Sequence, residues 1–203
     1  MLFRRISIIA AAALLFCTVA ISVAKAQDGR TVTDFSLTSP TNATVTLSSY
    51  ASNKAVVVVF VNPNCAFSKL YQSRLNALTA AYSGKGVQFL FINAPINLEA
   101  TADAADADKL KMKSTGSDDY PYLTDPGQKV SGLLGATKTP EAFVLQPAEN
   151  GFVVRYRGAI DDNAQVEAYA KERYVAQVLD NILAGKPAGV ADKRAAGCLI
   201  KRM

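Results

Sequence analysis

The sequence lacks histidine and tryptophan altogether and holds only three cysteines among its 203 residues. Without an imidazole, the chain cannot build a Ser-His-Asp triad or a Cys-His pair, and nearly all zinc sites are excluded. Any cysteine chemistry must therefore proceed without a histidine base. Thiol–disulfide exchange meets that condition, because the N-terminus of a helix can itself stabilise a thiolate.

The first 26 residues have the pattern of a secretory signal peptide. Arg4 and Arg5 precede a mostly apolar run at residues 6–23, and Ala24-Lys25-Ala26 supplies a small-x-small cleavage pattern. The run is also long enough for a membrane anchor, but the cleavage pattern and the polar residues after it favour removal of residues 1–26. We therefore expect a secreted or periplasmic protein.

Most of the basic excess of the chain belongs to this leader. It carries Arg4, Arg5 and Lys25 and no acidic residue, so its removal lowers the formal net charge from +5 to +2. A charge this small indicates no nucleic-acid surface, and no later stretch is apolar enough to span a membrane. The mature chain keeps two cysteines, Cys65 and Cys198, which an oxidising compartment allows to pair.

The strongest local pattern lies at residues 55–71. Its unbroken apolar segment at residues 55–61 predicts a strand buried on both faces, and Asn62-Pro63-Asn64 predicts a turn. Cys65 follows the turn and begins an amphipathic helix that should continue to Tyr82. Its predicted apolar face consists of Leu70, Tyr71, Leu75, Leu78 and Tyr82. A sulfur in the first turn of a helix lies near unpaired N–H groups and the helix dipole, which lower a thiol pKa. We interpret Cys65 as a reactive thiol that is open to attack; the alternative is a small, inert core residue.

The remaining periodicity predicts one α/β domain at residues 27–187 and a tail at residues 188–203 that carries Cys198. The strand at 55–61, the helix behind Cys65 and a second buried strand at 87–92 form a βαβ unit, so the two strands should be parallel. The other predicted elements are a β-hairpin at 34–37 and 44–47, helices at 98–113, 128–134 and 166–183, and an antiparallel strand pair at 142–145 and 152–157 with a turn at 147–151. The predicted apolar stripe of the last helix consists of Val175, Val178, Leu179, Ile182 and Leu183.

Five short motifs occur in order along the chain: DFSL at 34–37, FVNPNCAFSKLY around Cys65, Thr139-Pro140, YRGAIDDN at 156–163 and GCLIKR at 197–202. With these motifs and this order of elements, the chain resembles the thioredoxin fold. More narrowly, it resembles the redoxins related to alkyl hydroperoxide reductase and thiol-specific antioxidant proteins. The resemblance implies a thioredoxin-like three-layer α/β sandwich with a mixed sheet and an N-terminal β-hairpin.

By this resemblance, Cys65 stands where thioredoxins have the attacking cysteine of Cys-x-x-Cys. Pro140 stands where they have a cis-proline that presents backbone to an incoming disulfide or peptide. Two patterns of the relatives are missing: Ser68 replaces the second cysteine, and the peroxiredoxin Pro-x-x-x-Thr-x-x-Cys is absent. Three roles for Cys65 are then open: a monothiol resolved by an external thiol, a peroxidatic cysteine, or a partner of Cys198 in a folded-back tail. We favour Cys198 as the partner.

The predicted function is that of an exported thiol–disulfide oxidoreductase or redoxin-like antioxidant protein, with Cys65 as nucleophile and Cys198 as resolving thiol. Ser68, whose hydroxyl can at most donate a hydrogen bond to the thiolate, completes the predicted site with Thr139 and Pro140. No cofactor or metal is expected. The predicted partners are protein or small-molecule thiols and disulfides, with no nucleic acid and, after cleavage of the leader, no membrane.

Two alternative functions follow from the same residues. Because Ser68 replaces the second thiol, the protein could instead be a thioredoxin-fold binding or scaffold protein without redox turnover. An atypical thiol peroxidase, with peroxide as the substrate of Cys65, is the other alternative.

Overall fold

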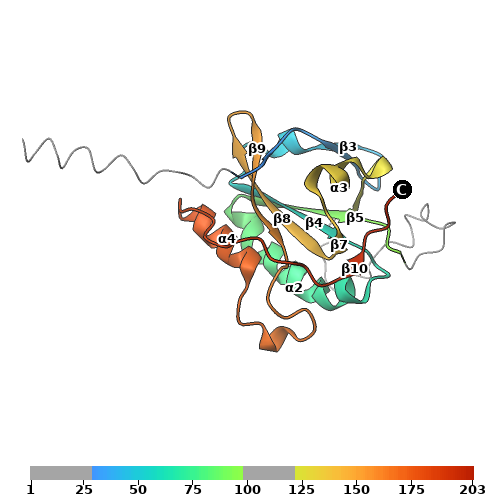
Figure 1. Cartoon of the computed structure of the whole chain (residues 1–203). Coiled ribbons are helices and arrows are strands. Elements are labelled where there is room, and N and C mark those ends of the chain that lie inside the picture. The colour runs from blue at the N-terminus through green and yellow to red at the C-terminus, as the bar shows by residue number, and fades with distance from the viewer. Residues whose placement is uncertain (1–28, 98–121) are drawn as a thin grey trace, which may run out of the picture.

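A mixed eight-stranded sheet forms the centre of the protein, with helices on both of its faces (Figure 1). The structure, a computed structural model, describes residues 29–97 and 122–203; the predicted leader and the helix predicted at 98–113 lie outside these ranges. Neighbouring strands follow the order β1-β9-β8-β4-β5-β6-β2-β3, and β7 pairs separately with β10. The strands are β1 Thr31–Val32, β2 Ser36–Thr38, β3 Thr44–Thr46, β4 Ala55–Val61, β5 Val87–Asn93, β6 Tyr122–Thr124, β7 Lys138–Thr139, β8 Glu141–Ala148, β9 Gly151–Gly158 and β10 Cys198–Leu199.

The helices divide between the two faces of the sheet. Helices α2 (Ala66–Tyr82) and α4 (Tyr174–Leu183) pack on one face, and α3 (Lys129–Leu134) packs on the other with the 3₁₀ turn η1 (Leu47–Tyr50). Among residues 29–97 and 122–203, no helix has the length and apolar character needed to cross a membrane. The remaining 3₁₀ turns are η2 Ser83–Lys85, η4 Pro126–Gln128 and η5 Glu167–Tyr169.

Strand β4 supplies both cores of the protein. All seven of its residues are buried, as the unbroken apolar run predicted. Because successive side chains of a strand point to opposite faces, Val57 and Val59 enter the core under α2 and α4, while Val58 and Phe60 enter the core under α3. This arrangement of helix layer, mixed sheet and helix layer confirms the predicted three-layer α/β sandwich.

The predicted βαβ unit is formed by β4, α2 and β5. The two strands are parallel along their whole length, as predicted. The buried stripe of α2 includes Tyr71, Leu75 and Tyr82. Leu70, which the spacing placed on this stripe, is instead 48% exposed. That prediction was wrong because Leu70 lies one residue, or about 100° of helix rotation, from Tyr71.

The N-terminal β-hairpin is also present. Strands β2 and β3 are antiparallel, and β2 joins the edge of the sheet through the pair Thr38 and Thr124 of β6. In the connecting turn, Asn42 has a φ of 59°, a left-handed conformation that asparagine tolerates better than most residues. The Ser39 hydroxyl accepts the Ala43 N–H, which closes the turn.

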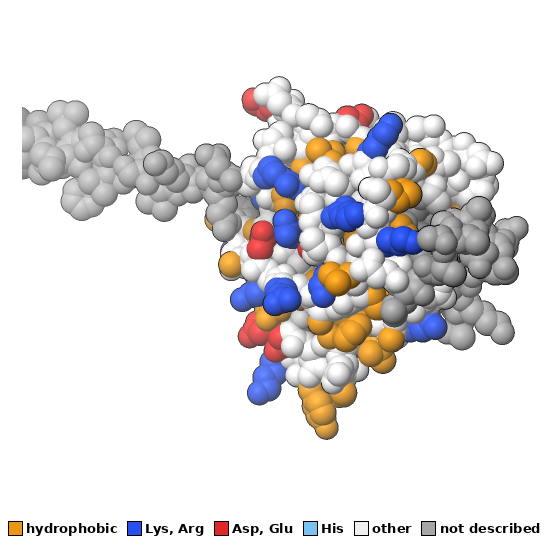
Figure 2. All heavy atoms as spheres, turned by 45° about the vertical axis from the view of Figure 1, so that its right-hand side comes forward, with side chains coloured by type: hydrophobic (Ala, Val, Ile, Leu, Met, Phe, Trp, Pro, Cys, Tyr) orange, Lys and Arg blue, Asp and Glu red, His pale blue; other side chains and the backbone are white. Residues whose placement is uncertain are grey.

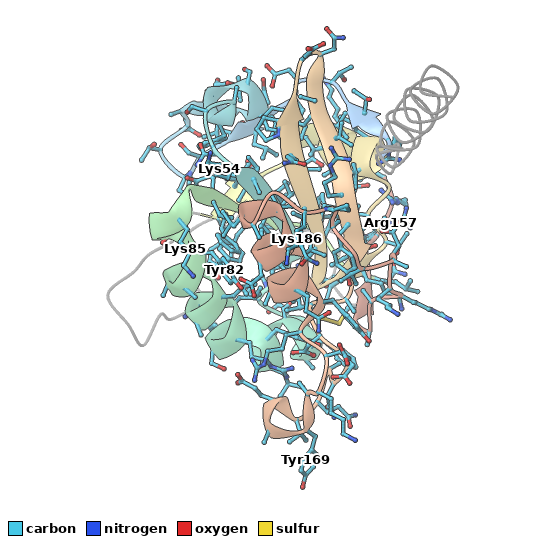
Figure 3. All side chains as sticks on the ribbon, turned by 90° about the vertical axis from the view of Figure 1, so that its left-hand side faces the viewer. Lys54, Tyr82, Lys85, Arg157, Tyr169 and Lys186 are labelled. Atoms are coloured by element: carbon cyan, nitrogen blue, oxygen red, sulfur yellow. A yellow bond between two sulfur atoms is a disulfide. The ribbon has the colours of Figure 1, made fainter. Side chains whose placement is uncertain are left out.

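The helix predicted at residues 166–183 is shorter than expected. Helix α4 begins only at Tyr174, and the preceding segment holds the short turn η5, where Tyr169 is 70% exposed and points away from the body of the protein (Figure 3). No residue between 166 and 173 is buried, so no apolar face favours a helix there. The predicted apolar stripe of α4 is confirmed for Val175, Val178, Leu179 and Ile182.

Two side chains give the backbone of this segment other hydrogen-bond partners. The Asp162 carboxylate accepts the N–H of Lys171, and the Asn163 side chain accepts the N–H of Val166. Short polar side chains of this kind compete with helical hydrogen bonds. The segment therefore remains a loop held by its own side chains.

Strands β8 and β9 are antiparallel, as predicted, but extend beyond their predicted ends. Strand β8 continues through Pro147, which the sequence assigned to a turn. The last contact of β8 with β4 is the pair Leu145 and Val56, so Pro147 lies where β8 has only β9 as a neighbour. A proline is tolerated there because it interrupts no central ladder. Strand β1, too short for a periodic pattern, adds to the outer edge of β9.

The tail at residues 188–203 returns along the end of β9 to the other side of the sheet (Figure 1). Gly158, the last residue of β9, forms a bridge with Lys193. A Cβ at Gly158 would collide with the Lys193 carbonyl, and the φ of +133° also favours glycine. Further on, Ile200 is buried in the core under α3. The tail is thus packed onto the domain along its length.

A buried ion pair joins α2 to the segment after β9. Arg74 Nη1 lies 2.8 Å from Asp161 Oδ2, and both side chains are at most 4% exposed. The Tyr71 hydroxyl donates to Asp161 Oδ1, and the carbonyls of Asn163 and Ala164 accept from Arg74. Burial and the hydrogen bond to Asp161 raise the pKa of Tyr71, so the phenol remains a donor. The motif YRGAIDDN therefore contributes a structural carboxylate, a role that the sequence did not reveal.

We predict that Asp161→Asn lowers the free energy of unfolding by about 3–5 kcal/mol, because it leaves the buried Arg74 without its counter-charge. Urea unfolding followed by circular dichroism measures this loss. The matched control is Glu167→Gln, which breaks an exposed pair with Arg173 and should cost less than about 1 kcal/mol. Equal losses in the two variants would contradict a stabilising role for the buried pair.

Candidate active site

Cys65 lies between the central strand β4 and helix α2. Three residues separate it from the end of β4, and it is the N-cap residue of α2, with extended backbone angles of φ −78° and ψ 120°. Its N–H donates to the Asn62 carbonyl, and its own carbonyl accepts the first helical bond from Lys69. The first N–H groups of a helix have no helical partner, so Cys65 is at the positive end of the helix dipole, as the sequence predicted, although its sulfur accepts no hydrogen bond from these groups.

The turn before Cys65 is fixed by the side chain of Asn62. This residue is 1% exposed, and its amide nitrogen donates to the Ala94 carbonyl at 2.8 Å, which ties the end of β4 to the residue after β5. Its amide oxygen accepts the Asn64 N–H at 2.7 Å. The turn signal Asn62-Pro63-Asn64 is therefore a rigid support for Cys65.

Cys65 and Cys198 are joined by a disulfide bond. Their Cα atoms are 5.9 Å apart, and 133 positions separate them in the sequence. The favoured partner for Cys65 is thus the one found in the structure. Cys65 itself is fully buried, whereas Cys198 is partly exposed. The expectation that Cys65 is open to attack is wrong for this disulfide-linked form, because the tail lies over it.

The tail reaches Cys65 by pairing with the strand that precedes Pro140. Strand β10 is antiparallel to β7, with Cys198 opposite Thr139 and Leu199 opposite Lys138. The peptide bond between Thr139 and Pro140 is cis, as the resemblance implied. The Thr139 carbonyl oxygen lies 3.0 Å from Cys65 Sγ, so the sulfur contacts backbone as well as Cys198. The structure therefore brings Cys65, Cys198, Thr139 and Pro140 together.

Gly197 permits this close approach. A Cβ at this position would lie 2.8 Å from the Thr139 carbonyl carbon and 3.3 Å from Pro140 N, and it would collide with the Thr139 oxygen. All three are backbone atoms, which cannot rotate away. The glycine of the tail motif GCLIKR is thus required by the contact between β10 and β7.

A second chain segment borders the tail on its other side. The Asn97 N–H donates to the Leu199 carbonyl, and the Lys201 N–H donates to the Pro95 carbonyl. On the β7 side, the Ile200 N–H donates to the Thr137 carbonyl at 3.0 Å. The stretch that carries Cys198 is therefore hydrogen-bonded on both edges, and the disulfide is only one of its attachments.

The C-terminal side chains anchor the tail further. Arg202 donates to the Ala136 carbonyl and to the Ser131 hydroxyl, and the Gln128 amide donates to the Lys201 carbonyl. Gln128 also accepts the Met203 N–H. These contacts hold the tail against η4 and α3, so Cys198 has a fixed position.

The two predicted hydroxyl residues have different surroundings. Ser68 is fully buried and its hydroxyl accepts the Asn62 N–H at 3.2 Å, so its observed role is to support the turn before Cys65. The Thr139 hydroxyl is buried and has no hydrogen-bond partner within the described part of the chain. Ser68 is thus placed beside the site as predicted, but its observed bond is to backbone.

Glu141 is a site residue that the sequence did not reveal. Its side chain is 4% exposed, and its carboxylate accepts the N–H groups of Thr137 and Lys138 at 2.6 and 3.0 Å and the Thr137 hydroxyl at 3.2 Å. Arg157 Nε lies 3.6 Å from the other carboxylate oxygen, Glu141 Oε1. Glu141 thereby fixes the turn that leads into Thr139 and Pro140. A charged residue directly after Thr-Pro, at the start of a buried strand, was the available signal.

One lysine side chain contacts the tail beside the disulfide. Lys138 Nζ lies 3.3 Å from the carbonyl of Gly197, the residue before Cys198. Lys and Arg side chains are spread over the face shown in Figure 2, which comes forward from the right-hand side of Figure 1. No group of three or more His, Cys, Asp or Glu side chains in the described ranges could hold a metal ion. The arrangement is suited to exchange at sulfur, since a helix N-terminus favours a thiolate at Cys65.

The site can now be compared with known families. The model of the AhpC/TSA family matches residues 29–168, a span that includes Cys65, Ser68 and the Thr139-Pro140 pair. The chain belongs to the AhpC/TSA family. The resemblance to thioredoxin-like redoxins is thus confirmed. Cys198 lies beyond the residues that match the AhpC/TSA model, so the tail disulfide is an addition to the part that defines the family here.

Solved structures support the same fold for this AhpC/TSA family member. An uncharacterised conserved protein from Geobacillus kaustophilus is 27% identical with a TM-score of 0.70, covering 86% of this chain and 92% of its own. A hypothetical protein from Sinorhizobium meliloti is 25% identical with a TM-score of 0.67, and the match covers 86% of this chain and 94% of that protein's chain. A thioredoxin-like protein in its oxidised form has a TM-score of 0.53 at 12% identity, and the match covers 79% of this chain and 97% of that protein's chain. At this identity the likeness is one of fold alone. The search of curated proteins found no match.

We predict that Glu141→Gln lowers the free energy of unfolding by about 2 kcal/mol, because a neutral amide replaces the charged acceptor of the turn at residues 137–138. Chemical denaturation measures this loss. The matched control, Glu149→Gln on the exposed turn between β8 and β9, should change stability by less than about 0.5 kcal/mol. If the two variants unfold at the same denaturant concentration, Glu141 does not organise the turn.

Proposed function

We propose that this AhpC/TSA family member is an exported thiol–disulfide oxidoreductase, with Cys65 as its nucleophile and Cys198 as its resolving thiol. One observation carries the proposal: the disulfide between Cys65 and Cys198 lies at the N-terminus of α2, against the cis peptide of Thr139 and Pro140. A purely structural disulfide has no need of a helix N-terminus, whereas a thiolate nucleophile does.

The reaction proceeds by two exchange steps. In the reduced protein, the Cys65 thiolate attacks a substrate disulfide, forms a mixed disulfide and releases one substrate sulfur as a thiolate. The Cys198 thiolate then attacks Cys65 Sγ, forms the internal disulfide and releases the second substrate sulfur. The substrate gains two electrons and the protein loses two. In the opposite direction, the internal disulfide oxidises a pair of substrate thiols.

Cys198 takes the role that the second cysteine has in a Cys-x-x-Cys motif. Ser68 has no sulfur and is bonded to the Asn62 N–H, so it cannot resolve a mixed disulfide. Cys198 lies opposite Thr139 in the β10–β7 pair, within bonding distance of Cys65. A resolving thiol from the tail therefore compensates for the missing second cysteine of the helix.

The leader pattern at residues 1–26 supports export to an oxidising compartment, where protein disulfides and small thiols are available. The proposed partners are accordingly protein thiols and disulfides or small thiols. Peroxide is a second candidate substrate, favoured by membership of the AhpC/TSA family. In that reaction the Cys65 thiolate is oxidised to a sulfenic acid, which Cys198 condenses to the disulfide with release of water.

The test is the activity of single-cysteine variants in two assays. We predict that Cys65→Ser abolishes the reduction of insulin disulfides by dithiothreitol above the uncatalysed rate, because the attacking sulfur is lost. Cys198→Ser should still form mixed disulfides at Cys65 but should lose most of its turnover. Ser73→Ala, a change at an exposed residue of the same helix, is the matched control and should keep activity within about threefold.

The same variants separate the rival functions. Loss of peroxide consumption in Cys65→Ser, without any effect on insulin reduction, would replace the first proposal by a thiol peroxidase. If Cys65→Ser matches the unmodified protein in both assays, redox catalysis is wrong and a binding role without redox turnover replaces it.

A further inference from the structure

We propose that the electron-donating thiol enters the catalytic cycle at Cys198, not at Cys65. This inference rests on the proposed function and deepens it, because it names the sulfur that the donor attacks and the sulfur that leaves. The donor class is a thiol that presents a thiolate to solvent. Three features of the disulfide-linked structure support this direction of attack.

The first feature is access. Thiol–disulfide exchange requires the thiolate to approach one sulfur of the disulfide directly. Cys65 has 0% of its surface exposed, whereas Cys198 is partly exposed. The next residue, Leu199, is 53% exposed, so this part of the tail faces solvent. A donor thiolate can therefore approach Cys198 but cannot reach Cys65.

The second feature is the leaving group. The sulfur that is not attacked departs as a thiolate, and the exchange is faster when that thiol has a low pKa. Cys65 is the N-cap residue of α2, a helix of 17 residues whose dipole stabilises an anion at this end. Cys198 lies in a two-residue strand and has no such support. Attack on Cys198 thus releases the better leaving group.

The third feature is that Cys198 is held in place. Its strand is bonded to β7 on one edge and to residues 95–97 on the other, and Ile200 is buried two positions later. The incoming thiolate therefore meets a sulfur that is held in a fixed position. Lys138, whose Nζ lies 3.3 Å from the Gly197 carbonyl, adds a positive charge that favours an approaching anion.

Reduction of the Cys65–Cys198 disulfide by the donor takes two exchange steps. The donor thiolate forms a bond to Cys198 Sγ while the bond between Cys198 Sγ and Cys65 Sγ breaks, and the electron pair of that bond leaves on Cys65 as a thiolate. A second donor thiolate then attacks the donor sulfur on Cys198, which releases the Cys198 thiolate and the oxidised donor disulfide. Two donor thiols are oxidised, their protons pass to solvent, and the protein gains two electrons.

The test locates the first mixed disulfide. The oxidised protein is treated with glutathione, quenched in acid at short times, alkylated with N-ethylmaleimide and digested with trypsin. Cleavage at lysine and arginine places Cys65 in the peptide 55–69 and Cys198 in the peptide 195–201. We expect glutathione on the Cys198 peptide and N-ethylmaleimide on the Cys65 peptide, with an excess over the opposite arrangement of about tenfold or more.

The outcomes distinguish this inference from the function on which it rests. Glutathione found mainly on Cys65, or equally on both cysteines, overturns the entry at Cys198 and leaves the oxidoreductase proposal intact. If glutathione adds to neither cysteine and the disulfide stays closed, both the inference and the proposed cycle are wrong.

A second variant tests whether the docked tail causes the preference. In Gly197→Ala, the new Cβ collides with the backbone of Thr139 and should separate β10 from β7, which uncovers Cys65 while the disulfide stays closed. The share of glutathione on Cys65 should then rise several-fold over the unmodified protein. Gly132→Ala is the matched control, since a Cβ there meets nothing within 4 Å, and its distribution should not change. The distribution in the unmodified protein decides the proposal by itself.

Discussion

The candidate site depends on the pairing of a two-residue strand at the end of the chain with a two-residue strand before a cis-proline. This pairing sets Cys198 opposite Thr139 and thereby against Cys65 at the N-terminus of α2. The covalent bond closes a loop of 133 residues, which in the loop-entropy description stabilises the fold by about 5 kcal/mol. Hydrogen bonds to residues 95–97 add a second edge, so the tail is a structural part of the domain.

The other elements can be understood as supports for this contact. The buried strand β4 and the side chain of Asn62 fix Cys65, the carboxylate of Glu141 fixes the turn before Thr139, and Gly158 lets the tail cross the end of β9. The site therefore combines three distant parts of the sequence. In the proposed function, Cys198 supplies the second thiol that Ser68 cannot provide.

Much of the architecture could be predicted because it follows from strong local patterns. The apolar run of β4, the helix behind Cys65 and the parallel pairing with β5 all came from periodicity, and Cys65 and Pro140 came from motifs. The prediction of a helix was wrong for residues 166–173. The side chains of Asp162 and Asn163 accept backbone N–H groups there, and composition alone does not show such hydrogen bonds. The pair of Arg74 with Asp161, and the role of Glu141, depend on contacts between distant residues. Periodicity cannot reveal such contacts.

The most direct measurement is a redox titration of the two cysteines in thiol–disulfide buffers of stepped potential, with the linked and reduced forms counted by mass spectrometry. A catalytic pair predicts one two-electron transition between the Cys65–Cys198 disulfide and two free thiols, at a potential above about −300 mV. A disulfide that stays closed well below that potential would be structural and would contradict the account, as would two cysteines that never link.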